Sequence, residues 1–268
     1  MTNKNTLTDG QRLIKYAAMT VAVLIIASIA SGVAEIIELI FGGGVLREMQ
    51  RYEISEDVSS LEMEIGGAVL SVVYSDGFAV ESNVSGLKVS ARRGTLTVKE
   101  RATFGRTVKG AEIILYIPEN FVFKNAEIET GAGDFNLASL SAERLSLSLG
   151  AGKVEIGELN VTEKAEIEGG AGAFSIKNGS IRSLDFEMGV GNADIRAELL
   201  GRCELNFGIG KANVTLIGSA DSYKLDVEKG IGKVTVDDSE YGSSTVIGNG
   251  ENILDIECGI GEVNVSFE

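Results

Sequence analysis

A Gly-x-Gly motif recurs seven times in the second half of the chain at nearly constant spacing, and this repeat constrains the fold more than any other feature. The intervals between successive motifs are 19, 20, 19, 19, 22 and 29 residues. A period close to twenty residues is typical of a solenoid, in which each repeat packs only against its neighbours. The first glycines of the motifs are Gly131, Gly150, Gly170, Gly189, Gly208, Gly230 and Gly259.

Apolar and polar residues alternate on both sides of each glycine pair. In the first repeat, Ala126 and Ile128 precede the glycines, and Phe135 and Leu137 follow them. Such alternation is typical of a strand with one buried face. The alternation changes phase across the glycines, so the chain must bend there, and glycine accepts the positive φ that a tight corner needs. We expect the residue between the two glycines, such as Ala132, to point into the core.

Two strands and a return in each repeat predict an all-β fold, namely a single-stranded right-handed parallel β-helix. Seven regular coils of about 19–20 residues are expected over 126–268, and irregular first coils over 61–125. A twisted β-sandwich is the alternative, but its turns would not keep a constant period with the same phase change at each one.

A stretch of 19 uncharged residues, from Tyr16 to Ala34, is long enough to span a bilayer as a helix. Three basic residues and one acid precede it and two glutamates follow it, so the positive-inside rule predicts a cytoplasmic N-terminus and an extracytoplasmic β-helix. We expect a single-pass protein of the cell membrane, with a cleaved signal peptide as the alternative. The predicted segments are a cytoplasmic tail at 1–15, a transmembrane signal anchor at 16–41 and a juxtamembrane linker at 42–60.

The composition excludes several functions. The chain has no histidine and no tryptophan, which removes Ser-His-Asp catalysis and histidine metal sites. Residues 126–268 hold 25 acids and 11 bases, a balance of −14, which argues against nucleic acid as a partner because phosphate binding needs clustered Lys and Arg. Cys203 and Cys258 lack metal-ligand or redox spacing and are expected to be buried free thiols.

The glycine motifs do not match known ligand-binding loops. The P-loop and the dinucleotide fingerprint each require a glycine that this chain lacks. The calcium-binding β-roll repeat requires an aspartate where this chain has an apolar residue, such as Phe174. The glycines are therefore interpreted as corners of the chain.

Carboxylates occupy most of the outward places on the strand before each corner. Stacking in register would set them in rows about 4.8 Å apart. The favoured interpretation is a solvated acidic face that keeps the solenoid soluble. The alternative is weak binding of Ca²⁺ or Mg²⁺, or of a cationic partner, and no other cofactor is expected. The candidate residues are Glu127, Glu129, Glu166, Glu168, Asp185, Glu187, Asp226, Glu228, Asp255 and Glu257.

A basic cluster precedes the regular repeats and has one acid, Glu100, within it. Such a cluster suits contact with anionic lipid headgroups or an anionic wall polymer, and a solvated loop explains it equally well. Its members are Arg92, Arg93, Lys99, Arg101, Arg106 and Lys109.

A carbohydrate-active β-helix enzyme, a lyase or hydrolase acting on cell-wall or plant polysaccharide, is the alternative function. Its best candidate region is the long loop 237–253, which holds the adjacent acids Asp237 and Asp238 and the aromatic Tyr241. These acids have no histidine and no repeated basic partner, so we predict that the chain is not an enzyme.

The N-terminal apolar segment, the stretch LEMEIGGAVLSVVYSDG, the strand AEIILYIPENF and the repeated AEIETGAGDFNLASL together resemble a bacterial "putative adhesin" β-helix family, a domain of unknown function. The resemblance covers about 60–268. It implies an extracytoplasmic, membrane-attached solenoid with no catalytic residues and with roles in adhesion or envelope sensing.

The sequence thus predicts a non-enzymatic surface scaffold or sensor that binds the lipid bilayer through one helix. Its further partners would be a cell-wall polymer, another envelope protein or a copy of itself. Self-association is expected because the strand GEVNVSFE is followed by no capping helix, which would leave the C-terminal coil uncapped.

Overall fold

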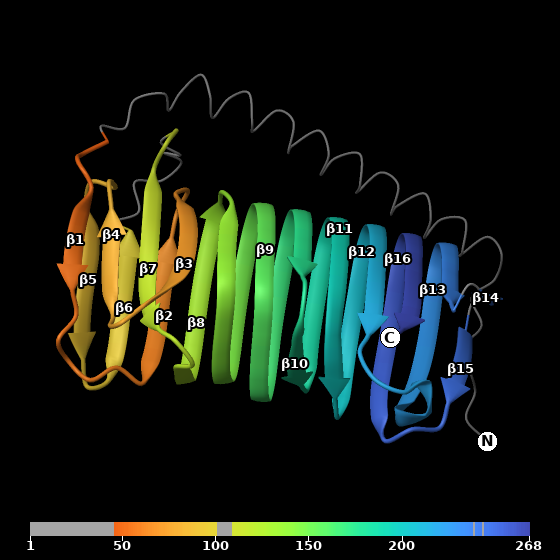
Figure 1. The fold of residues 1–268 in the computed structure, drawn as a ribbon. Helices are drawn as coiled ribbons and strands as arrows, with labels where there is room; N and C mark the ends of the chain where they lie inside the picture. Colours follow the sequence, from red (N-terminus) through yellow and green to blue (C-terminus); the bar gives the residue numbers. More distant parts are fainter. Residues whose placement is uncertain (1–45, 101–108, 238, 243) are drawn as a thin grey trace, which may run out of the picture. The chain divides into compact units, whose positions relative to one another are not determined.

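The computed structural model describes residues 46–100, 109–237, 239–242 and 244–268, all within one compact unit. They form sixteen strands joined in one sheet, plus a single 3₁₀ turn (Figure 1). No helix in this part of the chain is long and apolar enough to cross a membrane. The predicted cytoplasmic tail at 1–15 and signal anchor at 16–41 lie outside the described residues, as do residues 42–45 of the predicted linker.

Short strands come first and long, bent strands follow. The short strands are β1 (Gln50–Glu53), β2 (Ser60–Ile65), β3 (Val69–Ser75), β4 (Ala79–Ser82), β5 (Leu87–Arg92), β6 (Thr95–Glu100) and β7 (Glu112–Pro118). The coils are built from β8 (Val122–Ala132), β9 (Phe135–Ile176), β10 (Gly179–Arg182), β11 (Leu184–Leu200), β12 (Arg202–Leu216), β13 (Tyr223–Val236) and β16 (Asn252–Phe267). The 3₁₀ turn η1 (Ala220–Ser222) precedes β13, and the short strands β14 (Ser239–Tyr241) and β15 (Ser244–Gly248) follow it.

Successive coils pair in parallel, one repeat apart. Ile128 lies opposite Leu147, and Phe186 lies opposite Leu205. β9 passes through two Gly-x-Gly corners without leaving the sheet. The prediction of an all-β solenoid is therefore confirmed, whereas its right-handed sense stays a prediction.

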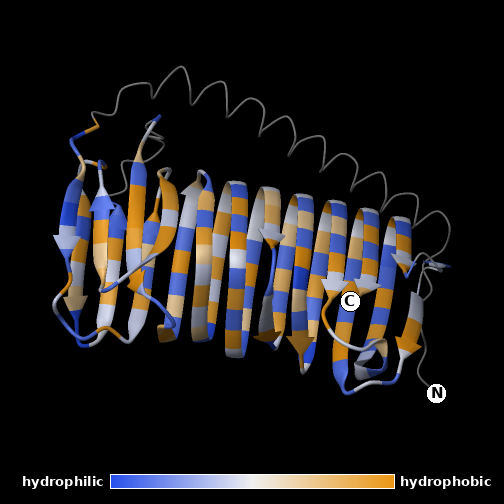
Figure 2. Cartoon of the chain, viewed as in Figure 1, coloured by the Kyte–Doolittle hydropathy of each residue, from blue (hydrophilic) through white to orange (hydrophobic). Residues whose placement is uncertain are grey.

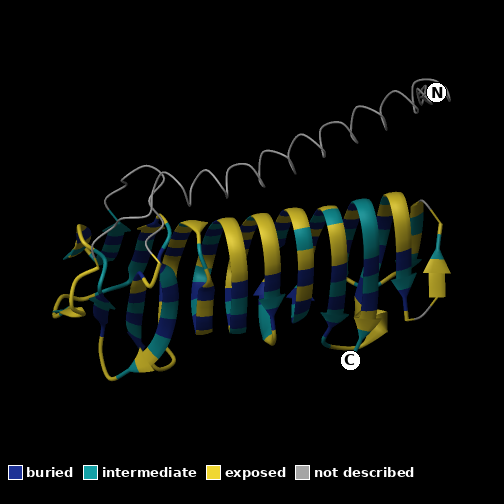
Figure 3. Ribbon diagram, turned by 90° about the horizontal axis from the view of Figure 1, so that it is seen from above, coloured by how far each residue is buried: buried dark blue, intermediate teal, exposed yellow. Residues whose placement is uncertain are grey.

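The core is a set of stacked rows, one for each inward place of the repeat. Side chains of neighbouring coils also pack across these rows: Phe174, Phe186 and Phe207 hold different inward places, and their ring centroids are 5.0 and 5.6 Å apart. Hydrophobic and hydrophilic residues alternate along the strands in Figure 2, and buried and exposed residues alternate in the same way in Figure 3. Burial of each such side chain contributes about 1.5–3 kcal/mol, so the rows together supply most of the driving force for folding.

The corners differ from the sequence prediction in which residue points inward. Ala132 is exposed, and Val190 and Ile231 at the same place are 39% and 50% exposed. The residue before the glycines is buried instead, as at Leu149 and Met188. The alternation of inward and outward side chains continues up to that residue. The corner backbones stack directly on each other, so the side chain between the two glycines lies on the outer, solvent side of the corner.

The last strand of the sequence is not at the end of the stack. β16 lies between β12 and β13 and pairs in parallel with both, as Figure 1 shows. The chain reaches this place after β14 and β15 run back antiparallel along the far side of β13. Between β15 and β16 the chain passes close to the start of β13. A Cβ on Gly250 would lie 2.0 Å from the carbonyl carbon of Ser222, so only glycine fits there.

The prediction of an uncapped C-terminal coil assumed that the last strand of the sequence is also the last strand of the stack, and this assumption is wrong. β16 has a strand on each side, and the outer edge of β13 is covered in part by β14 and β15. The repeat pattern could not reveal this order, because the coil of β16 carries the same inward places as every other coil. Self-association itself stays a prediction.

A row of hydrogen-bonded polar side chains fixes β16 in its place. Asn264 of β16 donates from Nδ2 to Asn213 Oδ1 at 3.1 Å, and its Oδ1 accepts from Thr235 Oγ1 at 2.6 Å. Asn213 in turn donates to Asp194 at 2.6 Å. The row joins β11, β12, β16 and β13, so a slip of β16 by one residue would break it.

Candidate functional site

The predicted acidic residues lie in register on the outward side of the strand before each corner. Glu166 lies opposite Asp185, and Glu228 lies opposite Glu257. Their order in space follows β16, so Asp255 and Glu257 lie between the β12 and β13 residues rather than at the end. Ser146 and Ser148 lie beside Glu127 and Glu129 and interrupt both rows there, and Asn206 interrupts the second row again between Glu187 and Glu257.

Two further carboxylates, Glu62 and Glu64 of β2, extend the rows, and sequence reasoning did not include them. Glu62 lies opposite Glu127, and Glu64 lies opposite Glu129. The signal was present, because the stretch LEMEIGG has the same alternation as the regular repeats. The acidic face therefore begins one coil earlier than the Gly-x-Gly count indicates.

Basic residues compensate part of the acidic face, and sequence reasoning missed them too. Arg202 pairs with Asp255 at 2.8 Å, and Lys164 pairs with Glu166. The hydrogen bond with the Glu166 carboxylate raises the pKa of Lys164, and the charges of Asp185 and Glu204 act in the same direction. The signal was the base that directly precedes several repeats, which the pleat places outward on the same face.

One row of carboxylates, which we call the outer acidic row, has no ion pair within the described part of the chain. All five of its side chains are exposed. Two pairs in this row, Glu168 with Glu187 and Glu257 with Glu228, lie on neighbouring strands, and like charges about 4.8 Å apart repel by about 0.9 kcal/mol even at the dielectric constant of bulk water. Ser148 lies beside Glu129, and Asn206 lies between Glu187 and Glu257. The outer acidic row consists of Glu129, Glu168, Glu187, Glu228 and Glu257.

The acidic face offers no formed metal site. Among the described residues, no group of three or more His, Cys, Asp or Glu side chains could hold a metal ion. Calcium takes 6–8 oxygen ligands around one point, whereas a row presents single carboxylates along a line. Weak binding of Ca²⁺ or Mg²⁺ therefore stays a prediction, and the residues present do not form a cage for either ion.

The predicted basic cluster is divided by the structure. Arg92 and Arg93 are exposed at the turn between β5 and β6, where Arg93 has a φ of 51°. Lys99 lies at the other end of β6 and is held by two carboxylates, Glu62 at 2.8 Å and Glu64 at 2.5 Å, which raise its pKa. Lys109 is exposed, and the last two members, Arg101 and Arg106, lie outside the described residues.

Glu100, the acid within this cluster, has a structural role. Its carboxylate accepts hydrogen bonds from the backbone N–H of Gly66 at 2.7 Å and of Gly67 at 3.3 Å. In later coils the equivalent corner groups bond to the neighbouring coil, as Ala132 N–H does to Gly66 O at 2.9 Å. The Glu100 side chain therefore takes the place of a preceding coil at the first corner.

Of the two adjacent acids in the loop considered for an enzyme, the structure describes Asp237. Asp237 accepts a hydrogen bond from the backbone N–H of Phe267 at 3.3 Å, so it holds the end of β16. Tyr241 is partly buried and packs against the core. Asp238 lies outside the described residues.

A small hollow opens beside Gly169, where the repeat has glycine in place of the buried residue that precedes other corners. Leu149, Val154, Phe174 and Met188 line it, and its volume is about 20 Å³. A water molecule needs about 10–15 Å³ by the same kind of measure. The hollow is therefore too small for a sugar or a cofactor.

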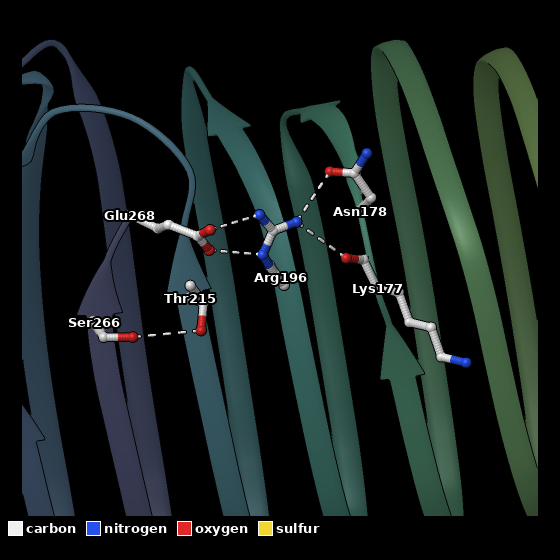
Figure 4. A network of polar contacts seen from close by, with 6 residues as sticks. All are labelled: Lys177, Asn178, Arg196, Thr215, Ser266 and Glu268. Carbon is white, nitrogen blue, oxygen red and sulfur yellow. Dashed lines mark hydrogen bonds and ion pairs between the residues drawn. The ribbon is translucent and has the colours of Figure 1, made fainter.

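The end of β16 is tied to the preceding coils by Arg196, which sequence reasoning did not single out. Its guanidinium donates to both carboxylate oxygens of Glu268, at 2.7 and 2.9 Å, and reaches Asn178 Oδ1 at 3.2 Å on the other side (Figure 4). The Glu268 carboxylate raises the pKa of Arg196, and the guanidinium lowers the pKa of Glu268. These side chains are bound to each other and hold the coils together.

Comparison with known proteins agrees with the stacked coils. The model of the Toastrack DUF4097 family matches residues 74–266. The chain therefore belongs to this family, and the predicted resemblance is confirmed. The family match indicates no catalytic class. No curated protein matches the sequence.

Several solved structures of bacterial proteins match most of the chain at low sequence identity. A "putative cell adhesion protein" from Clostridium sporogenes is 14% identical, covers 82% of this chain and 99% of its own, and has a TM-score of 0.36. A "putative adhesin" from Bacteroides fragilis is 12% identical over 81% and 95%, with a TM-score of 0.33. A "putative lipid binding protein" from Parabacteroides distasonis is 19% identical over 84% and 98%, with a TM-score of 0.45.

Proposed function

We propose that this chain is a non-enzymatic, extracytoplasmic scaffold that binds a cationic partner along the outer acidic row. One observation carries the proposal: five exposed carboxylates repeat along the coils without an ion pair among the described residues. The neighbouring acids Glu166 and Asp255 are paired with Lys164 and Arg202, whereas no member of the outer acidic row has such a base among the described residues. Such a row suits a partner that presents several amines or guanidinium groups in a line.

The partner would be a basic segment of another envelope protein or an amine-bearing wall polymer. An extended partner fits better than a small molecule, because the charges follow the stack over several coils and the hollow beside Gly169 has only about 20 Å³. The predicted anchor at 16–41 would hold this surface at the outside of the membrane.

The test uses the full-length chain in detergent micelles, with a fluorescent oligolysine peptide as the probe. The row variant carries Glu129→Gln, Glu168→Gln, Glu187→Gln, Glu228→Gln and Glu257→Gln. A control variant loses the same number of charges elsewhere, at exposed acids without ion pairs among the described residues: Glu56→Gln, Asp57→Asn, Glu119→Gln, Glu158→Gln and Glu251→Gln.

We expect the row variant to bind the peptide roughly ten-fold more weakly, and the control variant to lose much less, because contact distance decides the strength of each charge pair. The same pair of variants is then compared for retention of envelope proteins from a membrane extract. Equal binding by both variants would show that net charge, and not the row, attracts the partner.

Weak binding of Ca²⁺ or Mg²⁺ by the outer acidic row is the alternative to a cationic partner. Isothermal titration calorimetry of the full-length chain with each metal at millimolar concentration decides it. Heat that disappears in the row variant alone supports it, and no heat with the unmodified chain removes it.

Arg92 and Arg93 support a second contact, with an anionic wall polymer or lipid headgroup. Neither side chain has an ion pair within the described ranges, and a positive φ at a non-glycine residue costs energy that Asn or Gly would avoid. Inorganic polyphosphate is a suitable probe for the chain in micelles. Binding should fall in the variant Arg92→Gln, Arg93→Gln and persist in Lys153→Gln, Lys211→Gln; an equal loss in both would assign it to general charge.

A further inference from the structure

The two ends of the stack differ in how their edge strands are protected. At the N-terminal end, β1 pairs only with β4 and β5 only with β6 among the described strands. Both edges carry charge, with Arg51 and Glu53 in β1 and Lys88 and Arg92 in β5. Charged side chains on an edge strand discourage pairing with another chain.

The C-terminal end has an edge strand without this protection. β15 contains no charged residue and pairs only with β13 within the described part of the chain. In a strand, N–H and C=O groups point alternately to the two sides, so about half of those in β15 point away from β13. Val246 in its centre is 57% exposed, more than any other large hydrophobic residue described.

The β15 strand of a second copy can pair with the free edge of β15, because neither strand carries a charge and the pairing can be two-fold symmetric. Antiparallel pairing of β15 with β15 about a two-fold axis brings no two charges together, and the contact closes at the dimer. The nearest acids that would face each other are Asp226 of one copy and Asp226 of the other, each opposite its own Val246. The two β15 strands lie between them, so they are three strand spacings apart, about 14 Å. That exceeds the screening length of about 8 Å in physiological salt. Pairing of β5 with a second β5 centred on Ser90 would instead place Lys88 opposite Arg92, with these like charges about 5 Å apart.

We propose that two copies of this chain associate edge to edge through β15, in antiparallel register around Val246. The pairing joins the two sheets into one and covers the Val246 side chain of each copy. It leaves the outer acidic row of both copies open, so it does not depend on the function proposed for that row.

Disulfide formation between single cysteines tests the contact in the full-length chain. The chain's own Cys203 and Cys258 are buried, and burial raises the pKa of both thiols, so they react slowly. The test variant is Val246→Cys, and Val122→Cys is the matched control, because Val122 is a strand valine that is 50% exposed. On mild oxidation in micelles we expect the 246 variant to form covalent dimer roughly ten-fold faster, since Cβ atoms of opposed residues lie close enough for a disulfide.

Light scattering supplies the second measurement. The unmodified chain should show more dimer as NaCl rises from low to physiological concentration, because salt screens the repulsion between two acidic copies. Val246→Lys should make it monomeric, whereas Val122→Lys should not. Three results would overturn the proposal: equal oxidation of both cysteine variants, a dimer that persists in Val246→Lys, or a disulfide between Val246→Cys and Ser90→Cys chains, which would indicate head-to-tail stacking on β5.

Discussion

At the scale of single residues, the corner glycines allow the coils to approach each other. A Cβ on Gly150 would lie 2.0 Å from the carbonyl oxygen of Gly131, and a Cβ on Gly210 would lie 1.7 Å from that of Gly191. No side chain fits at these distances, so the backbones stack in direct contact. The glycine spacing could therefore be read from the sequence as a period of coils, because the requirement is local and repeats.

The neighbours Gly169 and Gly170 differ in the space that is available for a side chain. A Cβ on Gly169 would meet its nearest atoms at 3.7 Å, whereas one on Gly170 would lie 2.3 Å from Gly150 O. We expect Gly169→Ala to raise the free energy of unfolding by about 0.5–1 kcal/mol, by partly filling the hollow and restricting the unfolded chain. Gly170→Ala should lower it by about 1–3 kcal/mol or more through overpacking.

Urea unfolding of the two variants beside the unmodified chain measures both effects. Loss of stability in Gly169→Ala similar to that in Gly170→Ala would mean that the hollow is closed in solution. Sequence reasoning could not separate these two glycines, since both belong to the same Gly-Gly pair.

At the scale of elements, the repeat predicted the strands but not their order. Each strand before a corner has the same alternation, so the sequence gives no preference for which coils become neighbours. The only signal was the interval of 29 residues before Gly259, which contains β14 and β15. The order depends on contacts far apart in sequence, such as Asn264 with Asn213 and Thr235.

Asn264 should therefore contribute more to the free energy of unfolding than an asparagine at the same place in another coil. We expect Asn264→Ala to lower the free energy of unfolding by about 1–2 kcal/mol, because two hydrogen bonds of partly buried groups are lost. Asn136, at the equivalent place in the first repeat, is exposed, and Asn136→Ala should change it by less than about 0.5 kcal/mol. Hydrogen exchange should locate the loss of protection in β13 and β16; an equal loss in both variants would contradict the role of the row.

At the scale of the whole molecule, the acidic face opposes the stacking that the core favours. The chain carries a net charge of −15, and the outer acidic row adds repulsion between adjacent coils. The composition predicted this imbalance, but the ion pairs of Lys164 and Arg202, which decide where the unpaired charge remains, needed the register of the coils.

Salt should therefore stabilise the molecule, and the row variant should respond less. We expect the midpoint of thermal unfolding of the unmodified chain to rise as NaCl increases from about 10 mM to about 150 mM, over which the screening length falls from about 30 Å to about 8 Å. The variant with five Gln residues in the outer acidic row should be more stable at low salt and should rise less. If the charge-matched control variant behaves in the same way, net charge rather than row repulsion sets the effect.

The most direct test of the architecture concerns the place of β16. Thr215 lies opposite Ser266, with their hydroxyl oxygens 3.4 Å apart, whereas coils stacked in sequence order would place Thr215 beside Asp237. We therefore compare two double-cysteine variants, Thr215→Cys with Ser266→Cys and Thr215→Cys with Asp237→Cys. We expect rapid disulfide formation within one chain in the first variant and none in the second; a disulfide in the second variant alone would contradict the insertion of β16.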